Sequence, residues 1–250
     1  MAARLIADIN HPFSVLRVCR NSPTNPKEPD FLAYASTVAY YTADSNTPSS
    51  LSTEAAVRGF MSEGIEKLQR DVEILAAMAN EMEEYLRSDV LFWHIMDATM
   101  PRLTLGGYLM RQHRLLALED LLDEATRGVL ETAVIQYNQA LVEKIVRLEQ
   151  KIHRELEARL RQWSEYLRDL SKDKRAANYA AMVETRAMIE ALVGQLELPP
   201  YQLDTRVPQQ IVLLDNNLRR YWRRGDFVWP PEWQPAYPES VYWWLYGTPG

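Results

Sequence analysis

The 250-residue chain contains one cysteine, Cys19, and only four histidines. A single cysteine cannot form an intrachain disulfide or a thiolate zinc site, and this usage is typical of a reducing compartment. No uncharged apolar run is long enough to span a bilayer, and Asp8 interrupts the short apolar stretch near the N-terminus. The sequence therefore predicts a cytoplasmic protein without a secretion signal and without a membrane span.

Motifs that carry chemistry are also scarce. The chain has no Glu-x-x-His pair, which a di-metal site in a helical bundle requires, and no Gly-x-Ser-x-Gly elbow. Gly106 and Gly107 lack the other glycines of a nucleotide-binding fingerprint. Their amides could hold an anion with Arg102, Arg111 and His113, but a plain turn between helices is the favoured interpretation. We predict no catalytic residue, no bound metal and no cofactor.

Positive charge is in deficit, since 28 lysines and arginines face 34 acidic residues and the formal net charge is −6. This balance does not suggest a protein that coats nucleic acid. The local exception is a basic-aromatic cluster that contains Arg219, Arg220, Trp222, Arg223 and Arg224. Its arginines could contact phosphates while the rings stack on bases. The favoured interpretation is that they cap a helix and pair with acidic helices, with Trp222 in the core.

Helical periodicity is the main positive signal. Apolar residues recur every three or four positions from Ser52 to about Asp89, which predicts one long amphipathic helix with an acidic solvent face. The apolar segment 90–100 ends at Pro101 and is interpreted as a buried continuation or a short second helix. Another short helix is predicted from about Thr104 to Leu122.

His94 and Asp97 form the most interesting polar pair. Their spacing of three would place them on one face of a helix, inside a segment that is otherwise apolar. A buried polar group must be hydrogen-bonded, so a satisfied core histidine is favoured. The alternative is an enzymatic or ligand-binding site near this pair.

The longest predicted element runs from Asp123 to about Ser171 without a proline. Its apolar spacing is close to 3.6, which favours a straight bundle helix over a sustained coiled coil. A helix of about 49 residues would be about 73 Å long and needs cover along its length. A further helix from about Lys174 to Leu196 could fold back on it, giving an antiparallel hairpin over about 123–197.

The two ends of the chain differ from this bundle, which is assigned to residues 51–225. Residues 1–50 are rich in turn-forming residues and contain a candidate strand at 13–20. The segment 30–44 is predicted as a helix, although a strand is also compatible with its composition. Near the other end, Pro199 and Pro200 stop a helix, and Pro208 lies in the first turn of another that begins near Val207.

The tail, residues 226–250, is rich in tryptophan, tyrosine and proline. Exposed in full, it would form a larger apolar patch than soluble monomers usually tolerate, so we predict an ordered, extended strap. At least Trp229 and one of Trp243 and Trp244 should be buried. The strap could dock on its own bundle, on a second copy or on another partner. The candidate interface residues are Trp229, Trp233, Trp243, Trp244 and Tyr246.

Together these patterns predict an all-α protein, an elongated antiparallel helical bundle or hairpin with a mixed N-terminal segment and a C-terminal strap. The leading functional hypothesis is a non-catalytic structural or protein–protein interaction component that self-associates or joins a larger assembly. The alternatives are a nucleic-acid-associated accessory protein that uses the Arg219–Arg224 cluster, and a helical-bundle enzyme with a site near His94 and Asp97.

Overall fold

The computed structural model describes residues 62–142, 144–170 and 178–250. The predicted strand at 13–20, the predicted helix at 30–44 and the first residues of the helix predicted from Ser52 lie outside these ranges. The described chain is mostly helical, so the all-α prediction is confirmed. The longer helices are α2 (Glu63–Arg87), α3 (Leu105–Ala117), α4 (Glu124–Leu141), α5 (Ile145–Leu170), α6 (Tyr179–Leu196) and α7 (Arg206–Arg219).

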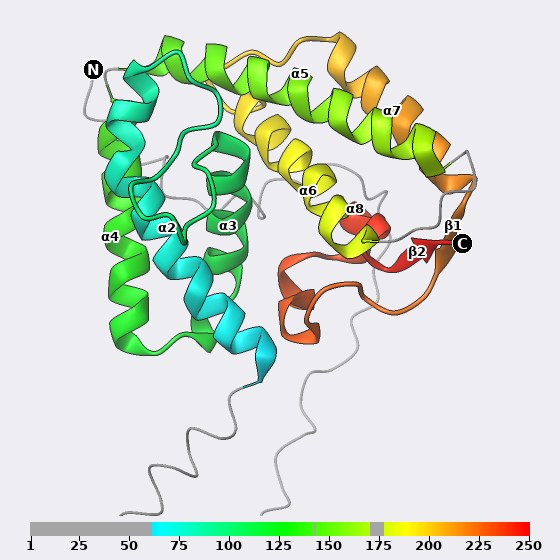
Figure 1. The fold of residues 1–250 in the computed structure, drawn as a ribbon, viewed down its shortest axis with the longest axis horizontal. Helices are drawn as coiled ribbons and strands as arrows, with labels where there is room; N and C mark the ends of the chain where they lie inside the picture. Colours follow the sequence, from blue (N-terminus) through cyan, green and yellow to red (C-terminus); the bar gives the residue numbers. More distant parts are fainter. Residues whose placement is uncertain (1–61, 143, 171–177) are drawn as a thin grey trace, which may run out of the picture. The chain divides into compact units, whose positions relative to one another are not determined.

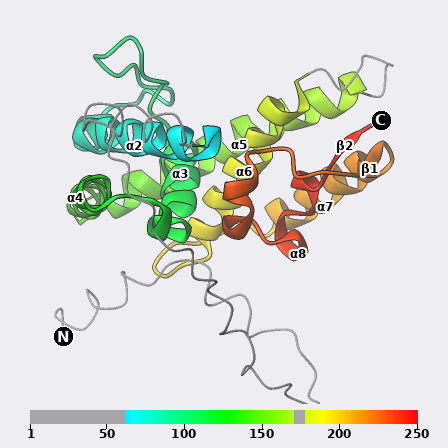
Figure 2. The same cartoon turned by 90° about the horizontal axis from the view of Figure 1, so that it is seen from below.

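The helices of residues 62–250 enclose one hydrophobic core. Helix α2 packs along α4, and α3 lies between α2 and α6 (Figure 1). Helix α5 packs against both α6 and α7. The view in Figure 2 shows α4 end-on beside α2 and α3, with α6, α7 and the tail further along α5. Helix α3 therefore joins the α2–α4 pair to the α5–α6–α7 group.

Helix α2 forms where the spacing predicted it. The side chain of Ser62 accepts a hydrogen bond from the amide of Ile65 and so caps the first turn. The buried side of the helix carries Leu68, Leu75 and Met82, all fully enclosed. The helices predicted at 104–122 and from Val207 are also confirmed, as α3 followed by the short 3-10 helix η2 (Glu119–Leu121) and as α7.

The single helix predicted over 123–171 is wrong, because α4 ends at Leu141 and a separate helix, α5, begins at Ile145. The two helices run in clearly different directions in Figures 1 and 2. Each half buries its apolar face against different partners, α4 against α2 and α5 against α6 and α7. Burial of both faces outweighs helix continuity, and β-branched residues such as Val142 and Ile145 weaken the helix at the break. The hairpin prediction survives only for α5 and α6, which runs back along α5.

The apolar segment 90–100 is also not helical, which corrects the prediction of a buried helix there. It forms an irregular loop closed by backbone hydrogen bonds between Trp93 and Leu103. Glu81 on α2 holds the loop, since its carboxylate accepts from Trp93 Nε1 at 2.6 Å and from the amide of Met96 at 3.0 Å. Apolar composition predicted burial, but this carboxylate fixes the loop with the Met96 side chain in solvent.

The tail is ordered, yet it is not an extended strap as predicted. It forms the 3-10 helices η3 (Pro231–Ala236) and η4 (Trp243–Leu245), one turn of helix α8 (Glu239–Tyr242) and strand β2 (Gly247–Pro249). Strand β2 pairs antiparallel with β1 (Trp222–Arg224), with Arg223 opposite Thr248. Pro231 opens η3, and Pro238 precedes α8; proline is tolerated at helix starts, so the prolines divide the tail into short turns.

Candidate functional site

The tail is attached to the bundle by a buried arginine. Arg114 on α3 is 2% exposed; its Nη1 donates to Asp71 of α2 at 2.5 Å and its Nε donates to the Tyr237 hydroxyl at 3.0 Å. The guanidinium carbon lies 3.8 Å from the centre of the Trp233 ring and 5.1 Å from that of Trp229. A desolvated cation between aromatic faces and a carboxylate is a strong anchor. Arg114 thus ties the middle of the tail to α2 and α3.

A second arginine repeats this arrangement at the end of the tail. Arg186 on α6 makes two hydrogen bonds of 3.0 Å to the carboxylate of Asp215 on α7, and its guanidinium lies 3.8 Å from the centre of the Trp244 ring. Tyr179 donates to the backbone carbonyl of Trp244 at 2.7 Å. Helices α6 and α7 and the tail therefore meet at one buried ion pair.

The predicted burial of the tail is confirmed, since Trp229, Trp233 and Trp244 are buried in the chain's own core. Trp243 and Tyr246 stay partly exposed. Of the five residues named as candidate interface residues, these two offer most of the remaining surface to a partner. The stacking of the tail on α3 and α6 could not be read from the sequence, because Arg114 and Arg186 carry no local motif.

The basic-aromatic cluster is dispersed in the structure. Arg219 stacks on the Trp243 ring at 3.7 Å, and the Trp222 ring meets Trp243 edge-on. Arg224 pairs with Glu239 at 2.9 Å. Two of the arginines therefore contact the tail itself. The favoured interpretation had instead expected them to cap a helix and to pair with the acidic helices.

The other two arginines of the cluster, Arg220 and Arg223, belong to different elements of the structure. Arg220 follows the last residue of α7, whereas Arg223 lies in the middle of β1. Successive residues of a strand point to opposite faces, so Arg223 faces away from its neighbours Trp222 and Arg224. Both side chains are exposed.

His94 and Asp97 do not form the buried pair that their spacing suggested. Both are exposed in the loop before α3. Asp97 accepts hydrogen bonds from the amide and the hydroxyl of Thr99, and these bonds lower the pKa of its carboxyl. The prediction is wrong because the segment is a loop, and residues three positions apart lie on one face only in a helix. Within residues 62–142, 144–170 and 178–250, no three His, Cys, Asp or Glu side chains converge to hold a metal.

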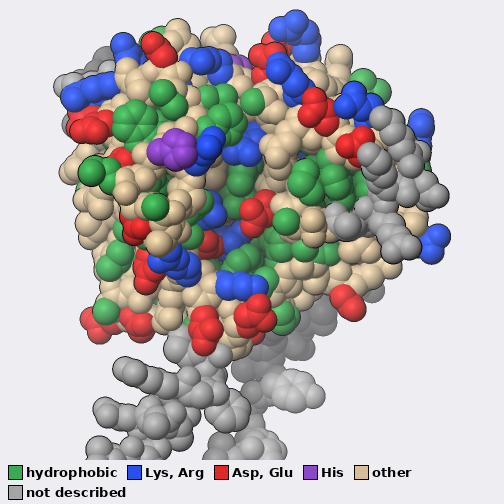
Figure 3. Space-filling view, viewed as in Figure 1, with side chains coloured by type: hydrophobic (Ala, Val, Ile, Leu, Met, Phe, Trp, Pro, Cys, Tyr) green, Lys and Arg blue, Asp and Glu red, His purple; other side chains and the backbone are tan. Residues whose placement is uncertain are grey.

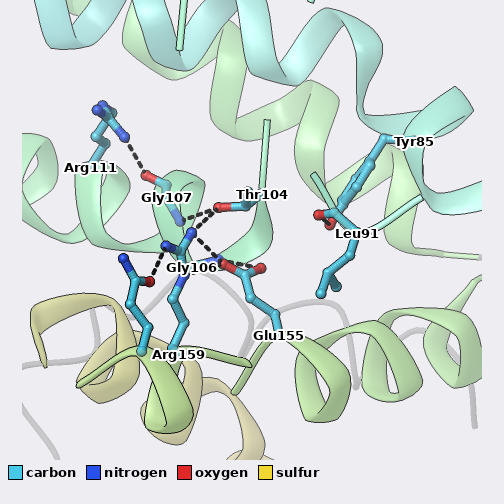
Figure 4. A network of polar contacts seen from close by, with 9 residues as sticks. Tyr85, Leu91, Thr104, Gly106, Gly107, Arg111, Glu155 and Arg159 are labelled. Atoms are coloured by element: carbon cyan, nitrogen blue, oxygen red, sulfur yellow. Dashed lines mark hydrogen bonds and ion pairs between the residues drawn. The ribbon is translucent and has the colours of Figure 1, made fainter. Parts of the chain in front are cut away.

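The amides at the start of α3 do hold an anion, but it belongs to the chain. Glu155 of α5 is fully buried, and its carboxylate accepts from the amide of Gly106 at 3.1 Å and from Arg159 at 3.2 Å (Figure 4). A side chain at position 106 would place Cβ 2.8 Å from this carboxylate, so the glycine permits the approach. Thr104 caps the helix by accepting from the amide of Gly107. This network links α3 to α5, and both glycine amides are occupied by side chains of the protein itself.

A row of cations on α5 covers the end of α2. Arg147, Lys151 and Arg154 recur at helical spacing. Arg147 donates to the carbonyl of the last residue of α2, and the other two donate to carbonyls just after the helix, with Lys151 Nζ 2.6 Å from Val90 O. Cations at a helix C-terminus satisfy free carbonyls and the helix dipole. Lys151 is 4% exposed and lies 4.1 Å from the centre of the Tyr85 ring, and burial lowers its pKa to about 8.

The break between α4 and α5 exposes a group of aliphatic side chains that we call the elbow patch. Its members and their exposed fractions are Ile135 56%, Val142 73%, Ile145 40% and Val146 65%. Ile135 lies on α4, Val142 directly follows the last residue of that helix, and Ile145 and Val146 open α5. This patch is a candidate interaction site that sequence periodicity missed, because the continuous helix predicted there gave no reason to expect a corner.

A shallow groove of about 420 Å³ adjoins the elbow patch. Small and amide side chains of α2 and α4 line it, including Ala79, Gln136 and Ala140. Glu83 and Lys144 face each other across its rim at 3.2 Å. Val142 belongs to the elbow patch and also lines the groove, so the exposed apolar patch and the hollow with its charged rim adjoin each other.

Comparisons of the chain with protein-family models, with curated proteins and with solved structures found no match. Among the described residues, no helix combines the length and the apolar character needed to cross a lipid bilayer.

Proposed function

We propose that this protein is a structural protein–protein interaction component that self-associates through the elbow patch. The observation that carries the proposal is the exposure of four β-branched aliphatic side chains at one corner of the fold, Ile135, Val142, Ile145 and Val146. Solvent-facing helix positions are normally occupied by polar residues, and contiguous apolar patches with polar rims are typical of interaction sites. Their burial against a partner would be favourable by about 25 cal/mol per Å².

A second copy is the partner that the local shape favours. In a two-fold symmetric contact, the same surface serves both subunits, so a protrusion on one copy must meet a hollow on the other. The elbow patch and the groove beside Ala79 and Ala140 supply both on one surface. Glu83 and Lys144 have opposite charges. In a two-fold contact Glu83 of one copy could pair with Lys144 of the other, and this would attract the two copies.

The oligomeric state of the purified chain tests this proposal. Multi-angle light scattering over a range of concentrations should give a particle mass that is a multiple of 29.0 kDa. The double variant Val142→Glu, Val146→Glu places charges in the elbow patch and should give the mass of one chain. Both side chains are exposed, so the variant should keep the melting temperature of the natural chain.

The matched control is Val212→Glu, Leu213→Glu on α7, where two aliphatic residues are similarly exposed outside the elbow patch. This variant should keep the assembly. A natural chain that stays monomeric at every concentration contradicts self-association. A patch variant that assembles like the natural chain shows that another surface is responsible.

A further inference from the structure

A second hollow, which we call the tail groove, lies where the tail crosses the first turns of α2 and α6. It is open and has a volume of about 490 Å³. One wall is formed by Trp229, Pro230 and Trp233 of the tail, and small residues of the two helices, such as Gly64 and Ala180, lie opposite. The tail groove contains no residue of the elbow patch, so binding in it does not depend on the proposed self-association.

The apolar wall of the tail groove is fixed in place from both sides. Trp233 Nε1 donates to the carbonyl of Gly64 on α2, and Trp229 Nε1 donates to the carbonyl of Ala180 on α6, each at 3.0 Å. The faces of both rings are also held by the guanidinium of Arg114 behind them. Trp229 and Trp233 are themselves almost entirely buried, so the surface that a ligand would meet is formed mainly by Val228, Pro230 and Pro231, which the two rings hold in place. Preorganisation of this surface lowers the entropy cost of binding.

The charge of the tail groove is strongly one-sided. Glu63, Glu184 and Glu232 line it, and among the lining residues that the structure describes Lys67 is the one basic residue. Lys67 is already paired with Glu63 at 2.6 Å. Glu184 is half-buried and forms no hydrogen bond or ion pair with another described residue. Figure 3 shows acidic side chains on this face, where α2 begins and η3 passes.

We propose that the tail groove binds an extended segment of a partner protein in which arginine or lysine stands next to proline or another apolar residue. The cation of such a segment would pair with Glu184, and its apolar neighbour would pack on Pro230 and Pro231. Extended proline-containing peptides bind aromatic-lined grooves because they lose little entropy on ordering. An acidic segment would meet the same carboxylates with repulsion.

A metal ion is the competing cationic ligand, and the geometry disfavours it. Glu63, Glu184 and Glu232 stand on three different segments, and they are not among residues that converge on a shared point within the described chain. A ligand whose charge sits on a long side chain can instead reach one carboxylate while its backbone follows the wall. This is the chemistry of a basic peptide.

Titration of the full chain with a synthetic peptide tests the proposal. The probe is the blocked hexapeptide Pro-Arg-Pro-Pro-Arg-Pro, followed by calorimetry and by the fluorescence of the tail tryptophans. We expect saturable binding that weakens as salt is raised, and no binding of the matched peptide with glutamate in place of arginine. Glu184→Gln should weaken binding about fivefold, the effect of losing an ion pair of about 1 kcal/mol.

The matched control is Glu131→Gln on α4, which removes an exposed carboxylate that does not line the tail groove. It should leave the affinity for the peptide unchanged. The elbow variant Val142→Glu, Val146→Glu should also bind normally, which separates this proposal from self-association. Absence of saturable binding, equal binding of the glutamate peptide, or an unchanged affinity of Glu184→Gln would each overturn the assignment.

Discussion

The guanidinium of Arg114 lies between the carboxylate of Asp71 and the face of Trp233, 3.8 Å from the centre of that ring. Residues from three distant parts of the chain therefore share one buried charge. Arg186 does the same with Asp215 and Trp244. The tail is held to the bundle through these two cations, and this attachment also builds the wall of the tail groove.

Replacement of Arg114 should destabilise the fold strongly. Arg114→Ala removes the stacking on Trp233 and leaves Asp71 buried with Arg111 as its remaining ion-pair partner. Breaking a buried pair costs about 3–5 kcal/mol, and we expect a decrease in the free energy of unfolding in this range. Urea denaturation measures it. Arg161→Ala breaks an exposed pair with Glu157 and should change stability by less than about 1 kcal/mol. Equal effects of the two variants would contradict the anchoring role of Arg114.

Loss of the tail should destabilise the chain without changing the number of chains in each particle. Truncation after Gly225 removes three buried tryptophans, and truncation of one such side chain costs about 3–5 kcal/mol. The truncated chain should melt at a much lower temperature or fail to fold, as measured by circular dichroism. Trp244→Ala is the milder variant, and its particle mass by light scattering should equal that of the natural chain. A change of mass would mean that the tail docks on a neighbouring copy.

Acid should weaken the attachment of the tail through His113. Its Nε2 lies 2.9 Å from the carbonyl of Ala236. Burial lowers the pKa of the imidazole; the hydrogen bond to Ala236 partly opposes this shift, Arg114 adds to it and Glu190 also opposes it. Once the pH falls below about 6.5, the folded chain binds fewer protons than the unfolded chain. The free energy of unfolding therefore decreases as the pH is lowered further. His113→Gln can still donate to Ala236 but does not titrate.

Chemical denaturation at pH 7 and pH 5 checks this prediction. The natural chain should lose more stability between the two values than His113→Gln does. Exposed carboxylates contribute equally to both chains and cancel in the comparison. Parallel losses in the two proteins would show that His113 is not the group responsible.

The sequence predicted those parts of the fold that depend on local pattern. The three- and four-residue spacing of Leu68, Leu75 and Met82 was enough for α2, and Pro208 marked the first turn of α7. The break at Val142 was not predictable, because no proline or glycine marks it and the packing of α4 and α5 on different helices decides it. Apolar composition was similarly misleading for the loop at 90–100, where Glu81 fixes exposed residues.

The candidate sites depended even more on tertiary contacts. Tryptophan content predicted that the tail is buried, but nothing near Arg114 or Arg186 in sequence indicated its anchors. The elbow patch exists only because the helix breaks, and the tail groove only because Trp229 and Trp233 meet the first turns of α6 and α2. The contacts that build the tail groove join residues more than 40 positions apart, and a single sequence does not specify such pairs.

The dispersal of the basic-aromatic cluster predicts weak affinity for nucleic acid. Arg219 stacks on Trp243 and Arg224 pairs with Glu239, so Arg220 and Arg223 are the cluster's two arginines left for phosphates. Fluorescence anisotropy with labelled single-stranded DNA at near-physiological salt should show no saturable binding. A complex that weakens steeply with salt and is lost in Arg220→Ala, Arg223→Ala would support the nucleic-acid hypothesis instead.

The titration of the buried Lys151 should affect the stability of the chain at alkaline pH. Burial lowers its pKa to about 8, whereas an exposed lysine in the unfolded chain titrates near 10.4. Between these values the unfolded chain keeps a proton that the folded chain has lost, so this lysine makes stability rise with pH. Burial raises the pKa of Tyr85 above its usual range, which makes stability fall once unfolded tyrosine ionises near pH 10. The effect of Lys151 on stability can therefore be measured, without that of Tyr85, between about pH 7.5 and 9.5.

Urea denaturation across that window should show a smaller rise in stability for Lys151→Met than for the natural chain. The methionine fills similar space beside Tyr85 but neither titrates nor donates to the carbonyl of Val90. Lys67→Met, which changes an exposed lysine on α2, should follow the natural chain. If Lys151→Met also follows it, the ammonium is better solvated than its position against Tyr85 implies, and the row of cations on α5 would stabilise the end of α2 by charge alone.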